Sequence, residues 1–189
     1  MALKNLPYGS AKKNGGAPGK MIKDFSTEEL EKLQATKEKL EEYFNGDGQE
    51  IFEVIKKITG KPIYTKEFHA SFATAGLYPY DVMNDWFMVP ATKNFSKQLT
   101  VICHELLHLQ VSHYYQVYCL KNGLTKEQFS NLNEALTFLL NDPLFQKFSL
   151  LPDKGYPYQR GKRQALEKAW QKTRDFSNLI EAAIKRVKE

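Results

Sequence analysis

The chain has 189 residues, of which 42% are hydrophobic and 26% are charged, a composition typical of a globular protein with one sizeable core. It contains no run of about 18 or more apolar residues and no apolar stretch of signal-peptide length near its N-terminus, so neither a membrane span nor classical secretion is expected. Its two cysteines, Cys103 and Cys119, are too few for a disulfide framework. We therefore expect reduced thiols and a cytoplasmic location.

The formal net charge of +5 is spread unevenly. Residues 1–20 carry a net charge of +4, residues 21–153 carry −5 and residues 154–189 carry +6. Basic ends can attract nucleic acid or an anionic membrane surface, but terminal segments also collect solvated charge. Solvation is the simpler interpretation.

Residues 1–20 contain four Gly, two Pro and four Lys without any periodicity. This composition is typical of a disordered basic arm, or of a tag left from expression. We therefore exclude this segment from the fold and assign residues 21–189 to a single domain.

The first half of that domain shows helical and then extended patterns. The capping box at residues 26–29 predicts a helix over about 27–44, and a second, shorter helix is predicted at about 49–59. The β-branched and aromatic runs at 63–68 and 86–89 predict two or three short strands, because Gly, Pro and Asn residues separate them.

The second half is predicted to be helical. Residues 95–120 form the most apolar helical pattern of the chain, and a further capping box predicts a helix from Thr125 to about Asn141. A loop rich in Pro, Gly and Tyr follows at 151–161. A single amphipathic helix is predicted after this loop, because apolar residues recur at helical spacing from Leu166 to Val187.

The predicted helix at 95–120 carries the sequence HELLH at residues 104–108. Two histidines four residues apart lie on one face of a helix, so His104 and His108 can reach the same metal ion, and Glu105 can reach a water bound to it. This HExxH arrangement predicts one Zn²⁺ per chain.

The position of Glu105 supports the metal interpretation. A carboxylate in such an apolar helix is unfavourable unless a cation or a hydrogen-bond donor accompanies it. Zinc with a bound water supplies that partner. The alternative, two core histidines that bond each other, does not explain why Glu105 stands between them.

A third zinc ligand is expected, because catalytic zinc usually has three protein ligands and a water. Glu134 is the strongest candidate, since it lies on the next helix, which the loop at 121–124 turns back against the first. Asp142 remains an alternative, although it is also suited to cap the turn before Pro143. His113 could join only if the helix broke, because it lies on the opposite side from His104.

The HExxH segment followed by Asn133-Glu134-Ala135 resembles the gluzincin branch of the zincin metallopeptidases, in a minimal single-domain form. The resemblance covers roughly residues 63–165. It implies an α+β, zincin-like fold in which a small, mostly antiparallel sheet packs on a central HExxH helix with further helices. It also implies His104, His108 and Glu134 as ligands and Glu105 as general base.

Two features depart from the family pattern. Many gluzincins have an acidic residue four positions after the Glu ligand, where it orients a zinc-bound His, and this chain has Phe138 there. Thr137, Asn133 or a backbone carbonyl would have to replace it. No motif fixes the donor that stabilises the oxyanion.

We assign that donor by position. Tyr156 and Tyr158 precede the last predicted helix and are the favoured candidates, with Arg160 as a further possibility, although tyrosines in loops commonly serve packing.

These residues predict a zinc-dependent metallopeptidase that hydrolyses peptide bonds through a zinc-bound water, with a peptide or protein as substrate. The strand near 85–89 is expected to be an exposed sheet edge able to pair with an extended substrate. The alternative is a catalytically inactive zincin-like zinc protein that acts as a binding or regulatory module. The oligomeric state, and the choice between internal and terminal cleavage, do not follow from the sequence.

A third hypothesis makes the chain a nucleic-acid or acidic-partner module. It would act through basic residues near the C-terminus, namely Lys162, Arg163, Lys168, Lys172 and Arg174. No nucleic-acid-binding motif accompanies them, so this hypothesis ranks last.

Overall fold

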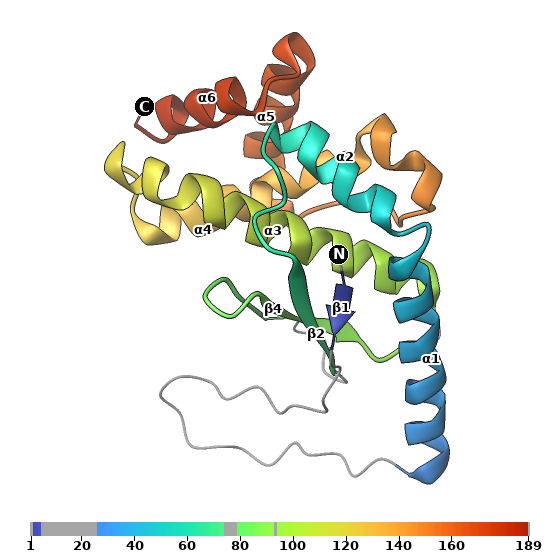
Figure 1. Ribbon diagram of the computed structural model, residues 1–189. Coiled ribbons are helices and arrows are strands. Elements are labelled where there is room, and N and C mark those ends of the chain that lie inside the picture. Colours follow the sequence, from blue (N-terminus) through green and yellow to red (C-terminus); the bar gives the residue numbers. More distant parts are fainter. Residues whose placement is uncertain (1, 5–25, 74–78, 93, 189) are drawn as a thin grey trace. The chain divides into compact units, whose positions relative to one another are not determined.

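The computed structural model describes residues 2–4, 26–73, 79–92 and 94–188. It is an α+β structure in which helices predominate (Figure 1). The chain divides into two compact units, one formed by Met1–Gln49 and Thr65–Phe95 and the other by Glu50–Tyr64 and Ser96–Glu189. No helix among the described residues is long and apolar enough to cross a bilayer.

The first unit contains one helix and one small sheet. The helix is α1 (Thr27–Asn45), whose extent confirms the prediction, and the strands are β1 (Ala2–Lys4), β2 (Glu67–Ala73), β3 (Tyr80–Asp81) and β4 (Trp86–Pro90). The strand order is β1-β2-β4-β3. Strand β1 belongs to the segment that we excluded from the fold, and the exclusion is wrong for these three residues because a strand this short leaves no alternating pattern. The rest of that segment, residues 1 and 5–20, lies outside the described residues.

The sheet is mostly parallel, so the prediction of a mostly antiparallel sheet is wrong. Strand β2 runs parallel to both β1 and β4, and only β3 and β4 are antiparallel. The continuous apolar run Phe87-Met88-Val89 is fully buried. Such a run, buried on both faces, is typical of parallel strands.

Strand β4 is not a sheet edge at residues 86–88, which corrects the expected substrate-binding edge. It pairs with β2 on one side, and on the other Trp86 and Phe87 face Asp81 and Tyr80 of β3. The Met88 N–H also donates to the carbonyl of Pro79 at 3.0 Å. Here the main-chain groups of β4 are therefore engaged on both sides.

The strand predicted at 63–68 begins instead at Glu67. The residues before it are held by side chains of another helix, α3 (Phe95–Lys121). The Pro62 carbonyl accepts hydrogen bonds from Gln110 and Tyr114, and the Tyr64 ring stacks on His113 with centroids 4.1 Å apart. The β-branched and aromatic residues of this segment therefore pack against a helix and do not pair with a neighbouring strand.

The second unit is helical. Besides α3, its α-helices are α2 (Gln49–Thr59), α4 (Lys126–Leu136), α5 (Arg160–Thr173) and α6 (Phe176–Lys188). The unit includes α2 from Glu50 onward. It also contains three 3₁₀ turns, at Thr137–Asn141, Pro143–Phe148 and Pro157–Gln159. The helices predicted at 49–59 and 95–120 are confirmed.

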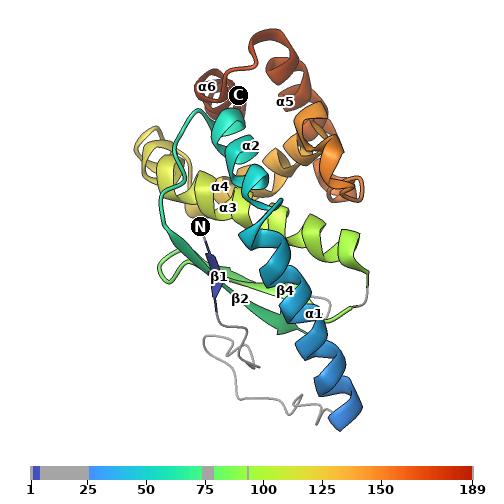
Figure 2. The ribbon, with the colours of Figure 1, turned by 45° about the vertical axis from the view of Figure 1, so that its right-hand side comes forward.

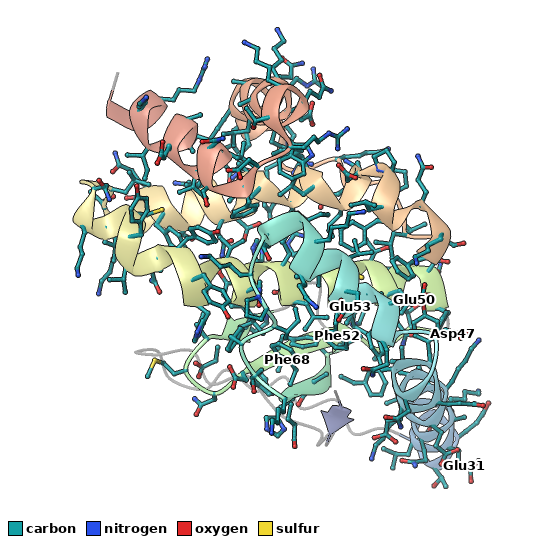
Figure 3. The ribbon with its side chains drawn as sticks, turned by 45° about the horizontal axis from the view of Figure 1, so that its top comes forward. Glu31, Asp47, Glu50, Phe52, Glu53 and Phe68 are labelled. Carbon is teal, nitrogen blue, oxygen red and sulfur yellow. The ribbon has the colours of Figure 1, made fainter. Side chains whose placement is uncertain are left out.

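Helix α2 packs on α3 through an amphipathic face. It buries Ile51, Phe52 and Ile55, whereas Glu50 and Glu53 are exposed. Figure 3 labels Phe52, Glu50 and Glu53 on this helix.

The end of α2 is tied to α3 by buried polar groups. The Tyr115 hydroxyl donates to the Thr59 carbonyl at 3.1 Å, and the Gln110 amide donates to the Lys61 carbonyl at 3.3 Å. These bonds fix the middle of α3 within its unit.

Helix α4 begins at the predicted capping box, in which the side chains of Thr125 and Gln128 bond each other's backbone N–H groups. The α-helix ends at Leu136 and continues to Asn141 as a 3₁₀ turn, so the predicted extent is right but the last turn is tighter.

The single helix predicted after residue 161 is two helices, α5 and α6 (Figure 2). Arg174 adopts a left-handed conformation with φ of 51° and ends α5. The Asp175 carboxylate then accepts a hydrogen bond from the Asn178 N–H at 2.7 Å, which starts α6. The apolar spacing continued through this break and hid it, although Asp175 is a good N-cap residue.

Candidate metal centre

Helix α3 places His104 and His108 one turn apart on the same face. Their Nε2 atoms are 2.9 Å apart and their rings meet edge to face. His108 has 1% of its side chain exposed and His104 has 26%, so the pair has one buried and one accessible member. The two ring nitrogens therefore point to one place at the surface of the helix.

Helix α4 brings a carboxylate to the same place. The Asn133 amide donates to the His108 carbonyl at 3.3 Å and to Ser112 Oγ at 3.1 Å, which joins α4 to α3 beside the histidines. The neighbouring Glu134 then places Oε1 3.3 Å from His108 Nε2 and Oε2 3.7 Å from His104 Nε2. The HExxH helix and its capped neighbour thus meet as the sequence predicts.

The spacing of these donor atoms fits a zinc ion. The ligand atoms of His104, His108 and Glu134 all lie within 4.8 Å of one another. Tetrahedral zinc holds its nitrogen and oxygen ligands at about 2.0–2.1 Å, which separates them from one another by about 3.3 Å. The two histidine nitrogens are 2.9 Å apart, and each lies 3.3 or 3.7 Å from a different oxygen of the Glu134 carboxylate, so the separations are close to that value.

The charges of the cluster are strongly coupled. Burial would lower the pKa of His104, but hydrogen bonds with Asp153 and Glu134 outweigh it and raise the pKa to about 10. Burial lowers the pKa of His108, with Glu134 acting in the opposite direction. Burial would raise the pKa of Glu134, but its bonds with the two histidines lower it far below the usual range. The Glu134 carboxylate therefore stays ionised and is available as a ligand.

Glu105 lies beside the cluster as a buried carboxyl group. Its exposed fraction is 4%, and its Oε2 has no hydrogen-bond partner among the described residues. Burial is the main cause that raises its pKa to about 8, and Glu134 adds to the effect. A cation held by His104, His108 and Glu134 would compensate this buried charge, so the residues fit a bound zinc ion.

Asp153 is a part of the site that sequence reasoning missed. It lies in the loop at 151–156, and its Oδ2 is 3.4 Å from His104 Nδ1, the ring nitrogen that faces away from Glu134. Thr137 and Asn133, predicted for this task, also contact this part of the site. Thr137 Oγ1 lies 3.3 Å from Asp153 Oδ1 and 2.8 Å from the Glu134 carbonyl, and Asn133 bonds the side chain and the carbonyl of His108. The carboxylate missing at Phe138 is thus supplied from a different element.

Arg163 is the second residue that the sequence did not assign to the site. Only 5% of it is exposed, and its Nη2 donates to Asp153 Oδ1 at 2.6 Å. Sequence reasoning grouped Arg163 with exposed cations that could bind nucleic acid, which is wrong for this residue. The signal was its spacing, because Arg163, Leu166 and Trp170 form the buried face of α5.

Tyr156 lies on the loop that carries Asp153, and Tyr158 lies in the 3₁₀ turn Pro157–Gln159 that follows it. Their rings stack with centroids 5.5 Å apart, and 52% and 73% of these residues are exposed. The negative charge of Glu134 is the largest cause that raises the pKa of Tyr156, followed by burial. Tyr156 is therefore within the electrostatic field of the cluster and keeps its proton.

The remaining candidates lie elsewhere. The Asp142 carboxylate accepts hydrogen bonds from Trp170 Nε1 at 2.9 Å and from Arg174, so it is not in the cluster. His113 stacks on Tyr64, and Arg160 is exposed at the start of α5.

Comparisons with models of known protein families, with curated proteins and with solved structures each returned no match. Any assignment of function therefore depends on the chemistry of the site itself.

Proposed function

We propose that this chain is a zinc-dependent metallopeptidase with a zincin-like fold of the gluzincin type, holding one zinc ion through His104, His108 and Glu134. The observation that carries the proposal is the combination of this donor triangle with the partnerless, buried carboxylate oxygen of Glu105 on the same helix. A site that needed zinc for stability alone would gain nothing from an additional buried carboxylate next to the ligands.

When bound, zinc supplies a Lewis acid that polarises a carbonyl group and lowers the pKa of water to about 7. Glu105 takes the proton from the attacking water at its carboxylate and later delivers it to the nitrogen of the leaving amine. Its burial keeps bulk water from competing for that proton. Peptides can approach from the side of His104 and Glu134, whose side chains are each 26% exposed.

Tyr156 is our choice for the donor that stabilises the oxyanion. Its hydroxyl stays protonated in the field of Glu134, so it can donate to the negative charge that develops on the substrate carbonyl. The ring stacks on Tyr158, which limits its orientations. Tyr158 is more exposed than Tyr156, Arg160 is also exposed, and no bond from Tyr158 or Arg160 to the cluster is seen among the residues that the structure describes.

Tyr156→Phe is expected to lower kcat by about 100-fold, the usual effect of removing one oxyanion donor, while KM and zinc affinity stay near those of the parent. Steady-state kinetics on a peptide substrate measures this. Tyr158→Phe is the matched control and is expected to retain activity. Equal losses in both variants would show that the pair serves packing and not catalysis.

The proposed function is tested by hydrolysis of an unbiased peptide library, followed by mass spectrometry. We expect cleavage by the zinc-loaded protein, loss of cleavage after treatment with a chelator, and recovery when one equivalent of zinc is added back. Zinc uptake without cleavage of any peptide would instead support the inactive zinc protein. Cleavage that survives chelation would contradict a role for the metal.

A further inference from the structure

Arg163 is a buried cation outside the proposed ligand set, yet it contacts two segments that support the ligands. Its Nη2 donates to the Asp153 carboxylate at 2.6 Å and to the Asp153 carbonyl at 3.1 Å, and its Nη1 donates to Thr137 Oγ1 at 2.9 Å. The planar guanidinium presents donors in two fixed directions, so it can bond two acceptors at once. A lysine ammonium on its flexible stem does not have this geometry.

The Nη1 and Nη2 atoms of Arg163 bond two residues, Thr137 and Asp153, and each of these contacts a different proposed ligand. Asp153 places its other carboxylate oxygen 3.4 Å from His104 Nδ1. Thr137 donates to the main-chain carbonyl of Glu134 at 2.8 Å, at the point where α4 passes into the 3₁₀ turn, and its hydroxyl also lies 3.3 Å from Asp153 Oδ1. Arg163 is therefore two contacts away from His104 and two contacts away from Glu134.

Gly155 shows that the chain makes room for this arginine. It has a φ of +59°, which favours glycine, and a Cβ added there would lie 2.5–2.7 Å from atoms of the Arg163 side chain. The Gly155 N–H also donates to Asp153 Oδ1 at 3.0 Å. With the guanidinium in this position, a side chain at residue 155 would contact it, so glycine lets the loop lie against Arg163.

We propose that Arg163 is a positioning residue that couples the docking of α5 to the metal centre. It fixes His104 through Asp153 and Glu134 through Thr137, so the C-terminal helices contribute to zinc affinity without supplying a ligand. This inference rests on the proposed zinc site. Because coupling between two equilibria is reciprocal, bound zinc must in turn strengthen the docking of α5.

The first test is the zinc affinity of Arg163→Met, measured by competition with a chromophoric chelator. We expect affinity about 10–100-fold weaker than that of the parent, the usual effect of losing a contact that supports a ligand. The d–d absorption of the cobalt-substituted protein should also change, because the ligands lose their fixed orientation. Arg174→Met is the matched control: it removes another Arg–Asp pair, with Asp142, at the other end of α5.

Arg163→Lys keeps the charge and serves if the methionine variant does not fold. A lysine at this position cannot bond Asp153 and Thr137 at the same time, so we expect weakened zinc affinity and a changed cobalt spectrum here too. Parent-like affinity and spectrum in a folded Arg163 variant would overturn the inference, and so would an equal loss in Arg174→Met. A parent that binds no zinc would instead overturn the proposed function.

Hydrogen exchange on the unaltered protein tests the reciprocal effect without any substitution. Zinc is expected to slow exchange of the α5 amides more than that of the α2 amides, because the hydrogen bonds that join the end of α2 to α3 come from Gln110 and Tyr115 and not from a proposed ligand. Equal protection of the two helices would contradict the coupling.

Discussion

Glu105→Gln is expected to leave zinc bound and to lower peptide hydrolysis by about 10²–10⁴-fold, the usual range for loss of a general base. The amide has the shape of the carboxyl group but cannot accept the proton of the attacking water. Zinc content and turnover, measured on the same preparation, test this expectation. Glu127→Gln, an exposed change on α4, is the control and should retain turnover. A fully active Glu105→Gln variant would remove Glu105 from its assigned role.

The same substitution has an expected effect on the stability of the metal-free protein. Burial raises the pKa of Glu105 to about 8, from an ordinary value of 4.5. The folded state therefore holds this proton more tightly than the unfolded state, and Glu105 lowers stability progressively as the pH rises from about 4.5 to about 8. Without metal, Glu105→Gln should unfold at a higher urea concentration than the parent at pH 7, with the difference vanishing near pH 4. This buried carboxylate therefore lowers the stability of the metal-free protein, and a cation bound by the proposed ligands would offset the loss.

Glu134→Ala is the second substitution with a large expected effect. It removes the only carboxylate among the three proposed ligands and leaves two histidines, which cannot complete the usual set for catalytic zinc. Loss of a residue that only supports a ligand usually weakens zinc binding by about 10–100-fold. Because Glu134 is itself a proposed ligand, we expect a larger loss of zinc affinity, and a loss of hydrolysis with it. Chelator competition measures the affinity.

Glu127→Ala is the control for this change, because Glu127 lies on the same helix and is exposed. It should bind zinc as the parent does. If Glu134→Ala kept the affinity of the parent, the third ligand would have to be another residue, and the convergence of α3 and α4 on one ion would be the wrong explanation for the cluster.

The helical framework of the site could be predicted from local signals. The capping box at Thr125 sets the start of α4, and the HExxH spacing sets the face of α3, so the meeting of Glu134 with His104 and His108 follows from short-range rules. These signals are strong because each depends on residues only a few positions apart.

The support of the site was not predictable in the same way. Asp153 lies between Pro152 and Gly155, a composition that indicates a turn, and nothing local shows that its carboxylate reaches His104 across 49 positions of sequence. Arg163 did leave a signal, since it occupies the apolar face of α5, where a cation must be paired. Our prediction missed this signal because the arginine lies within a basic segment.

The strands were the least predictable elements. The composition of residues 63–66 favours a strand, but Tyr64 stacks on the side of α3 and strand β2 begins only at Glu67. Strand propensity mainly reports a half-buried, packed environment, and a helix can supply that environment as well as a sheet.

The number of zinc ions bound per chain by the unaltered protein can be measured by elemental analysis after equilibrium dialysis against zinc. We expect one ion per chain, removed by a chelator and restored on dialysis. We also expect removal of zinc to lower the melting temperature, because zinc would bind the folded state alone. A folded protein that binds no zinc under these conditions would contradict both the proposed metal centre and the proposed hydrolysis.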